Sequence, residues 1–372
     1  MKYSFGSDNH SGVHPKILKA IERANTGYSF GYGEDSYTES VLAKIELLCG
    51  GDCSALFVLN GTGANVVSLS AFLKPFSAVL APSSAHILDD ECGAVERFSG
   101  CRIIPIECCK NEIGEYNGKV NVDKVKEFLK FGDQHKVQPI ILSISQPTEN
   151  ETLYTLDEIS SLASLMHSYG CYLHVDGSRI SNACAAIGIG IKEMIKETGV
   201  DVLSFGGTKN GLLIGEAVIL YHRNRNCDCS TKNNSEKTLL KRRESELKFL
   251  RKQATQLYSK NRFIAAQFEE YIKNDLYLKM AKHSNLMAKY LEKKLLTLRK
   301  QDGSFAIKIT KSVDVNAVYA ILPFTMPQIK RLQEKYLFYL WDTRRKEARL
   351  MCSFNTTKEA IDSLVEDFRK LL

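Results

Sequence analysis

The sequence lacks several features that would point to a membrane, secreted or metal-binding protein. It contains no run of about 18 apolar residues, the length that a transmembrane helix needs. Its first residues, MKYSFGSDNHSG, lack the apolar stretch of a signal peptide. The 11 cysteines are an odd number with no CxxC pair and matching second half, so we expect neither a disulfide scaffold nor a zinc site. These absences favour a cytoplasmic enzyme with reduced thiols and no metal.

The charge and composition are those of an ordinary globular protein. The chain has 50 basic and 43 acidic residues, and the resulting net charge of +7 does not by itself argue for a nucleic-acid partner. Hydrophobic residues make up 44% and charged residues 25% of the chain, which excludes overall disorder. A length of 372 residues predicts two domains, or one large α/β domain with a small partner.

Short apolar runs alternate with helical periods up to about residue 221. This alternation predicts an α/β fold with a mostly parallel sheet covered by helices. We expect strands at Ala55–Leu59, Ala78–Ala81, Arg102–Ile106, Pro139–Ser145, Tyr172–Asp176, Val202–Phe205 and Ala217–Tyr221, and helices at Gly63–Leu73, Val120–Lys130, Leu156–Tyr169 and Ile191–Thr198. Such sheets bind ligands at the carboxyl ends of their strands, so polar residues just after a strand are site candidates.

The remaining segments predict an arm and a second, smaller domain. Residues 1–35 form the predicted N-terminal arm, 36–262 the large domain and 263–372 a small α/β C-terminal domain. The expected elements outside the large domain are helices at Pro15–Ala24, Met326–Lys335 and Lys358–Lys370, a helix broken near Asn274-Asp275 within Ile264–Leu298, and strands at Ala306–Ile309, Ala317–Ile321, Leu337–Trp341 and Arg349–Cys352. Residues 222–236 predict a solvated loop. We expect the basic helix that follows this loop to pack on its own domain rather than on another subunit.

The strongest chemical signal is an acid and a lysine that follow neighbouring strands. The segment LHVDG ends a strand in Asp176, and SFGGTKNG places Lys209 on a glycine-rich turn after the next strand. In a parallel sheet both residues reach the same edge. Pyridoxal 5′-phosphate needs such a pair, a carboxylate that keeps its ring nitrogen protonated and an amine that forms a Schiff base. Alone, Asp176 could be a helix cap and Lys209 a solvent-facing lysine; together they are more specific.

Further candidates surround this pair in the sequence. The segment NGTGAN at 60–65 predicts a strand, a tight turn and a helix start, where backbone N–H groups and a hydroxyl can hold a phosphate. His86 follows a short strand and could stack on a cofactor ring or act as a base, or be an ordinary core histidine. Arg179 and Arg349 could each bind a carboxylate, or be surface arginines.

These motifs resemble those of the threonine aldolase family, in the aspartate-aminotransferase-like fold type I group of pyridoxal-phosphate enzymes. The resemblance covers nearly the whole chain. It rests on SDNHSG near the start, YGED at 32–35, NGTGAN at 60–65, AHILDDECGA at 85–94, HVDGSRISNA at 174–183 and SFGGTKNG at 204–211, with weaker matches at KNRF (260–263) and ARLMCSFNT (348–356). It implies a lyase that cleaves threonine or allo-threonine to glycine and acetaldehyde through an external aldimine.

The resemblance also implies a role for each matching residue. Lys209 would form the internal aldimine, Asp176 would pair with the pyridine nitrogen, and His86 would stack on the ring and help to take the hydroxyl proton. The other implied cofactor contacts are Gly61, Thr62, Thr208, Arg179 and Arg262, the last of these reaching a phosphate across a subunit interface. Ser7, Arg179 and Arg349 would bind the substrate carboxylate, in a homodimer or homotetramer with shared active sites.

One departure from the family pattern and three rival functions remain open at this stage. Glu149, in the segment QPTENE, stands where many members carry a second active-site histidine, so the base is either His86 or a water that it orients.

The rival reactions are β-elimination and serine hydroxymethyl transfer on the same fold. A rival of another class is a protein that binds RNA or an acidic partner through the basic segment 237–252, but Glu244 and Glu246 interrupt its charge and favour a solvated helix face. The pattern does not choose between threonine and allo-threonine.

Overall fold

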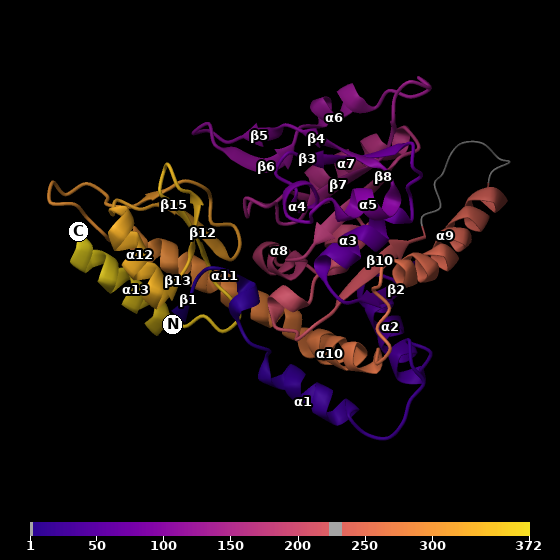
Figure 1. Cartoon of the computed structure of the whole chain (residues 1–372), viewed down its shortest axis with the longest axis horizontal. Helices are drawn as coiled ribbons and strands as arrows, with labels where there is room; N and C mark the ends of the chain where they lie inside the picture. Colours follow the sequence, from indigo (N-terminus) through magenta and orange to yellow (C-terminus); the bar gives the residue numbers. More distant parts are fainter. Residues whose placement is uncertain (1–2, 223–232) are drawn as a thin grey trace.

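A seven-stranded sheet organises the larger part of the computed structural model, which describes residues 3–222 and 233–372, with backbone only at 233–241 (Figure 1). In spatial order the strands are β2 (Cys53–Val58), β10 (Glu216–Tyr221), β9 (Val202–Phe205), β8 (Tyr172–Gly177), β7 (Gln138–Ser145), β3 (Ser77–Pro82) and β4 (Arg102–Ile106). The run from β9 to β4 is parallel, and β10 is antiparallel to both neighbours. The predicted mostly parallel α/β sheet is confirmed.

Helices cover both faces of this sheet, which explains why its strands are apolar along most of their length. Successive side chains of a strand point to opposite faces: Leu203 lies in the core with α2 (Ser36–Leu48), α7 (Leu156–Ser168), α8 (Ile180–Ile187) and α10 (Arg262–Ile272). Val202 lies in the core with α3 (Gly61–Ser70) and α5 (Ala94–Ser99). The sheet is therefore the middle layer of three, and its strand ends are the exposed part that can carry a site.

Several elements of this region differ from the sequence-based expectation. A hairpin of β5 (Cys108–Lys110) and β6 (Tyr116–Val120) was not predicted, because its strands are short and contain polar and glycine residues. The helix α6 is shorter than predicted, at Val122–Phe128, since Asn121 caps its start. The expected helix at Ile191–Thr198 is a single wide turn, η2 (Lys192–Lys196), with i→i+5 hydrogen bonds.

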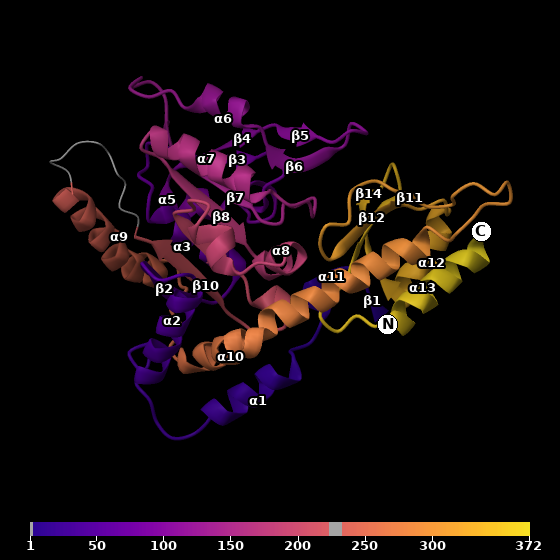
Figure 2. The ribbon, with the colours of Figure 1, turned by 180° about the vertical axis from the view of Figure 1, so that it is seen from behind.

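A four-stranded antiparallel sheet forms the smaller part of the molecule. Its strands are β11 (Lys308–Ile309), β12 (Ala317–Ile321), β15 (Glu347–Met351) and β14 (Tyr339–Asp342), packed with α12 (Met326–Lys335) and α13 (Lys358–Leu371). Near residue 274 the chain takes two left-handed residues, which separate α10 from α11 (Leu276–Leu295) where the break is predicted. Figure 2 shows α11 running from one part to the other; Met280 belongs to the first core and Met287 to the second.

The N-terminal arm connects both parts. Its first strand, β1 (Tyr3–Ser4), pairs with β13 (Tyr336–Leu337) of the smaller part. A short helix, η1 (Asp8–His10), follows, and α1 (Pro15–Ala24) lies on α10, as predicted for its bounds. The domain limits at 35 and 262 stay predictions. No helix in the described ranges is both long and apolar enough to cross a membrane.

The basic helix α9 (Asn233–Gln253) packs on its own chain. Leu247 is buried with the side chains of α3, and the Arg243 guanidinium lies 4.3 Å from the Tyr172 ring centroid and 4.7 Å from that of Phe72. The favoured packing is confirmed for the side chains from residue 242 on. The loop predicted at 222–236 falls largely outside the described residues.

Candidate functional site

Asp176 and Lys209 lie at the carboxyl edge of the central sheet, as predicted. Asp176 is the penultimate residue of β8, and Lys209 lies in a one-turn helix, η3 (Thr208–Asn210), directly after β9. The turn before it approaches the β8 loop so closely that a Cβ at Gly206 would lie 2.2 Å from the Ser178 carbonyl oxygen. A side chain there would displace the backbone that positions Lys209.

The Asp176 carboxylate is buried and is held as an anion. The backbone N–H and the hydroxyl of Ser178 donate to one of its oxygens, at 2.9 and 2.6 Å, and Asn65 Nδ2 donates to the other at 2.8 Å. Burial acts to raise the pKa of Asp176, but the Ser178 hydrogen bonds and the Lys209 charge outweigh it and lower that pKa below the usual aspartate value.

A polar chain connects Asp176 to His86. The amide of Asn65 also donates to Glu91 Oε1, and the same oxygen lies 2.9 Å from His86 Nδ1. The hydrogen bond to Glu91 raises the pKa of His86 above its usual value, against the opposing effect of burial. Sequence reasoning missed Asn65 and Glu91 as functional residues, although both lie inside motifs that it had selected.

The phosphate candidates lie at the start of α3. Asn60 caps this helix through its side chain, which accepts the Gly63 N–H at 2.8 Å. Gly61 and Thr62 occupy the first turn, where backbone N–H groups have no partner within the helix and the helix dipole is positive. Behind the lysine turn, buried Glu216 accepts the Gly207 N–H, and burial raises its pKa to about 7.

The predicted carboxylate binders have different surroundings. Arg179 is buried and donates from Nε and Nη2 to Asp8, at 2.6 and 3.1 Å, so most of its fork is already used. Arg349 lies over the Trp341 ring, with its guanidinium carbon 4.9 Å from the centroid, and its buried Nε has no hydrogen-bond partner among the described residues. Ser7 caps η1 and accepts the Asn9 N–H. Sequence reasoning missed Asp8.

Two other candidates are placed by their contacts. Arg262 Nη1 donates to the carbonyl oxygens of Thr26 and Gly27 in the arm, so its predicted contact with a phosphate on another subunit stays a prediction. The backbone carbonyl of Glu149 accepts from the Tyr319 hydroxyl at 3.0 Å, and the charge of Glu149 contributes to raising the pKa of His86. Glu149 therefore acts electrostatically on the candidate base.

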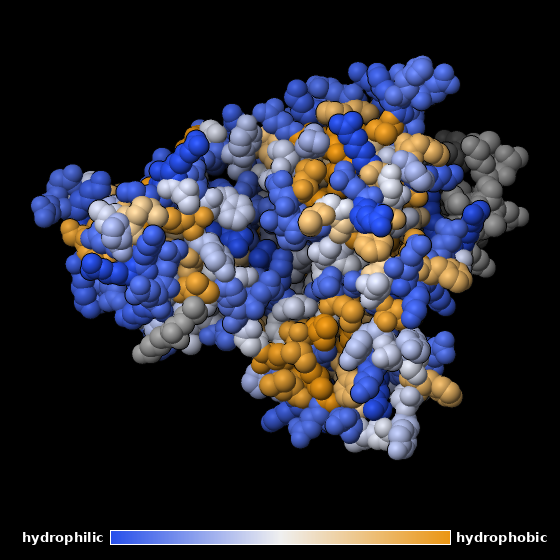
Figure 3. Space-filling view, viewed as in Figure 1, coloured by the Kyte–Doolittle hydropathy of each residue, from blue (hydrophilic) through white to orange (hydrophobic). Residues whose placement is uncertain are grey.

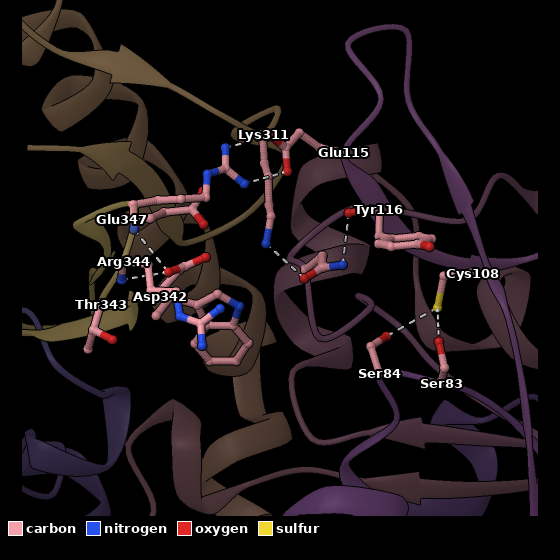
Figure 4. A pocket seen from close by; sticks show the side chains of 13 residues that line it. Ser83, Ser84, Cys108, Glu115, Tyr116, Lys311, Asp342, Thr343, Arg344 and Glu347 are labelled. Atoms are coloured by element: carbon pink, nitrogen blue, oxygen red, sulfur yellow. Dashed lines mark hydrogen bonds and ion pairs between the residues drawn. The ribbon is translucent and has the colours of Figure 1, made fainter.

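A cavity of about 580 Å³ lies between the β5–β6 hairpin and the smaller sheet, and its lining includes none of the predicted site residues. Figure 4 shows Lys311, from the segment after β11, reaching toward the large part of the chain; its amine donates to Asn150 at 2.8 Å. Burial lowers the pKa of Lys311 to about 8. Arg345 crosses the same gap to pair with Glu115.

Comparison with protein families decides the assignment. The model of the β-eliminating lyases matches residues 4–321. The chain belongs to this family. It is 32% identical to the low-specificity L-threonine aldolase of Pseudomonas aeruginosa over 371 residues, covering 99% of this chain and 97% of that protein. A Pseudomonas species provides a second such relative, also at 32% and with the same coverage.

Solved structures of the family's relatives share the fold. The threonine aldolase of Leishmania major has a TM-score of 0.84 at 26% identity, covering 99% of each chain. A putative L-allo-threonine aldolase from Listeria monocytogenes has a TM-score of 0.69 at 16% identity, covering 100% of this chain and 96% of its own. The predicted fold type I architecture and the predicted lyase class are confirmed. The alternative of a basic binding protein finds no support in these comparisons.

Proposed function

We propose that this chain is a pyridoxal-phosphate-dependent aldolase that cleaves threonine or allo-threonine to glycine and acetaldehyde. The observation that carries the proposal is the buried Asp176 anion at the end of β8, with Lys209 on the adjoining turn and a polar chain leading to His86. The threonine aldolases among the relatives support the same reaction.

The side chains present fit pyridoxal 5′-phosphate. Lys209 would hold its aldehyde carbon, and the Asp176 anion would hold a proton on its ring nitrogen. Its phosphate would lie at the start of α3, against the backbone of Gly61 and Thr62 and beside Thr208. When bound, the cofactor supplies the electron sink that takes up the electron pair of the bond broken at Cα.

The protein's own residues would choose which bond breaks. Arg349 would offer donors to the substrate carboxylate, since its Nε has no partner among the described residues, and Ser7 would add a hydroxyl. The charge of Arg179 is balanced by Asp8, so Arg179 would help to orient the carboxylate rather than supply net positive charge. Holding the carboxylate there fixes the Cα–Cβ bond in the reactive orientation. Neutral His86, directly or through a water that it orients, takes the β-hydroxyl proton, and Cβ leaves as the aldehyde.

The test of this proposal is product analysis with purified protein and added pyridoxal phosphate. L-Threonine and L-allo-threonine should each release acetaldehyde and glycine in equal amounts, without added folate. A keto acid with ammonia would instead identify β-elimination, and a requirement for folate would identify hydroxymethyl transfer. Either result would replace the aldolase assignment.

We also propose a homo-oligomer, a dimer or tetramer, whose active sites are shared. Figure 3 shows hydrophobic surface gathered over the region of α1 and α10, and the arm that follows α1 exposes Tyr28 and Phe30 at 107% and 79% of their full area. Apolar surface of this kind is usually covered by a partner. A second copy would cover it and would bring its own Arg262 to a phosphate.

Shared sites predict complementation between two inactive variants. Lys209→Ala and Arg262→Ala chains should each be inactive alone. After they are dissociated together and reassociated, roughly a quarter of wild-type turnover should return, because half of the random two-fold dimers are mixed and each mixed dimer keeps one intact site. Turnover and sedimentation are measured on the same samples. No recovery from chains that do form mixed dimers would show that the sites are not shared.

A further inference from the structure

Glu151 is a buried carboxyl group in a costly setting that the proposed chemistry does not use. Its side chain is 1% exposed, and neither carboxyl oxygen accepts a hydrogen bond from a described residue. Its φ of 62° lies in the left-handed region, which is unfavourable for a residue with a side chain. Buried groups without hydrogen-bond partners and residues with strained φ are uncommon, and both concentrate at functional sites.

The surroundings of Glu151 are those of the substrate carboxylate site. Its Oε1 lies 3.5 Å from Arg179 Nη1, the donor of Arg179 that Asp8 does not use. Arg179 thus lies between two carboxyl groups, although it can neutralise only one. Six charged or titratable groups interact electrostatically with Glu151, and they come from all the segments packed around it: Arg179, Asp8, Arg349, Glu149, Lys311 and Tyr319.

The protonation state of Glu151 therefore sets the charge of this site. Asp8 stays ionised, because Arg179 lowers its pKa against the effect of burial. Burial raises the pKa of Glu151, and Arg179 offsets this only in part. When Glu151 is neutral, the negative charge of Asp8 balances the positive charge of Arg179, and the positive charge of Arg349 remains for an incoming carboxylate. With Glu151 ionised, a second negative charge opposes that carboxylate in a buried region, where screening by water and salt is weak.

We propose that Glu151 is a positioning residue that acts through Arg179 and couples binding of the substrate carboxylate to the uptake of a proton. The substrate binds well while Glu151 is neutral and progressively less well once it is ionised. This inference rests on the proposed function in one respect, namely that the substrate is an amino acid whose carboxylate reaches Arg349.

The first test is the pH dependence of KM in the loaded enzyme and in its Glu151→Gln variant. One linked proton makes the wild-type KM rise by up to about tenfold per pH unit above the Glu151 pKa. Glutamine has the same shape but no proton that titrates, so this rise of KM should be absent in the variant. The pH dependence of kcat, which His86 governs in the proposed mechanism, should keep its form. A KM profile that is the same in both proteins would overturn the proposal.

The second test measures protons directly and needs no turnover. Glycine, the expected product, carries the same carboxylate, and its binding to the loaded protein is followed by calorimetry in buffers of different ionisation enthalpy. Wild type should take up a fraction of a proton that grows as pH rises through the Glu151 pKa, and Glu151→Gln should take up less. If no hydroxy amino acid is cleaved but this difference is found, the proposed function fails and the proton coupling stands. Equal uptake overturns the coupling.

Stability separates a charge role from a purely structural one. Because the folded-state pKa of Glu151 is raised, its contribution to the free energy of unfolding is complete below the ordinary glutamate pKa. This contribution is lost as pH rises through the raised pKa. The melting temperature of Glu151→Gln should therefore exceed that of wild type increasingly as pH rises. Glu151→Gly removes the backbone strain as well, and serves for every measurement if the glutamine variant does not fold. A pH-independent difference in both variants would contradict the proposal.

Discussion

Replacing Lys209 with alanine is expected to reduce aldehyde release from threonine by at least about 10³-fold. In the proposed mechanism this amine holds the cofactor's aldehyde carbon and also carries protons there, and loss of a proton-transferring group alone costs about 10²–10⁴-fold. The glycine turn that presents Lys209 is fixed by backbone contacts, so the variant should fold. The measurements are acetaldehyde release and the absorbance of the bound cofactor.

Chemical labelling gives the same prediction a second readout. Borohydride treatment of the loaded wild type should leave the cofactor attached to the peptide that contains Lys209. The matched control is Lys311→Met, which removes another half-buried amine, one that lines the neighbouring cavity and whose pKa is lowered to about 8. In that variant the label should stay on Lys209. A label on a different peptide, or undiminished turnover in Lys209→Ala, would refute the site.

Replacing His86 with asparagine is expected to reduce kcat by about 10²–10⁴-fold, the usual contribution of a positioned acid–base group. Asparagine can keep a hydrogen bond to Glu91 but cannot accept a proton at neutral pH. The base must be neutral, so wild-type kcat should fall as pH drops through the His86 pKa. Because the Glu91 hydrogen bond raises that pKa, this fall should begin above the pH of an ordinary histidine.

Glu91→Gln provides the control for this assignment. Its amide oxygen can still accept from Asn65, but the negative charge beside His86 is removed. The acid limb of kcat should therefore move to lower pH while turnover at higher pH persists. The measurement is the full pH profile of kcat in the wild type, His86→Asn and Glu91→Gln. An unchanged limb in Glu91→Gln would mean that another group is the base.

The central sheet could be predicted because its signals are local. The strands at Arg102–Ile106 and Val202–Phe205 have the predicted bounds, since short, mostly apolar runs between polar turns determine where a covered strand begins and ends. Asp176 and Lys209 could be paired in advance because parallel strands bring their carboxyl ends to one edge. The hairpin at residues 108–120 and the wide turn at Lys192–Lys196 carry no such regular pattern.

The neighbours of the predicted site residues could not be obtained in this way. Asp8 and Arg179 are 171 residues apart, and their ion pair forms only when the arm folds against the start of α8. Arg179 was predicted to meet a substrate carboxylate directly, and in the fold most of its donors serve Asp8. Asn65 became the link between Asp176 and Glu91 only through the approach of α3 to β8.

The sequence by itself determined the alternation of strands and helices, the edge that carries Asp176 and Lys209, and the resemblance to a lyase family. These depend on residue spacing along one segment and on the rule that parallel strands end together. The tertiary structure decided which charges share a site, namely that Glu91 acts on His86 and that Glu151 and Asp8 enclose Arg179. Burial and electrostatic fields depend on distances between segments remote in sequence, and only the folded chain sets those distances.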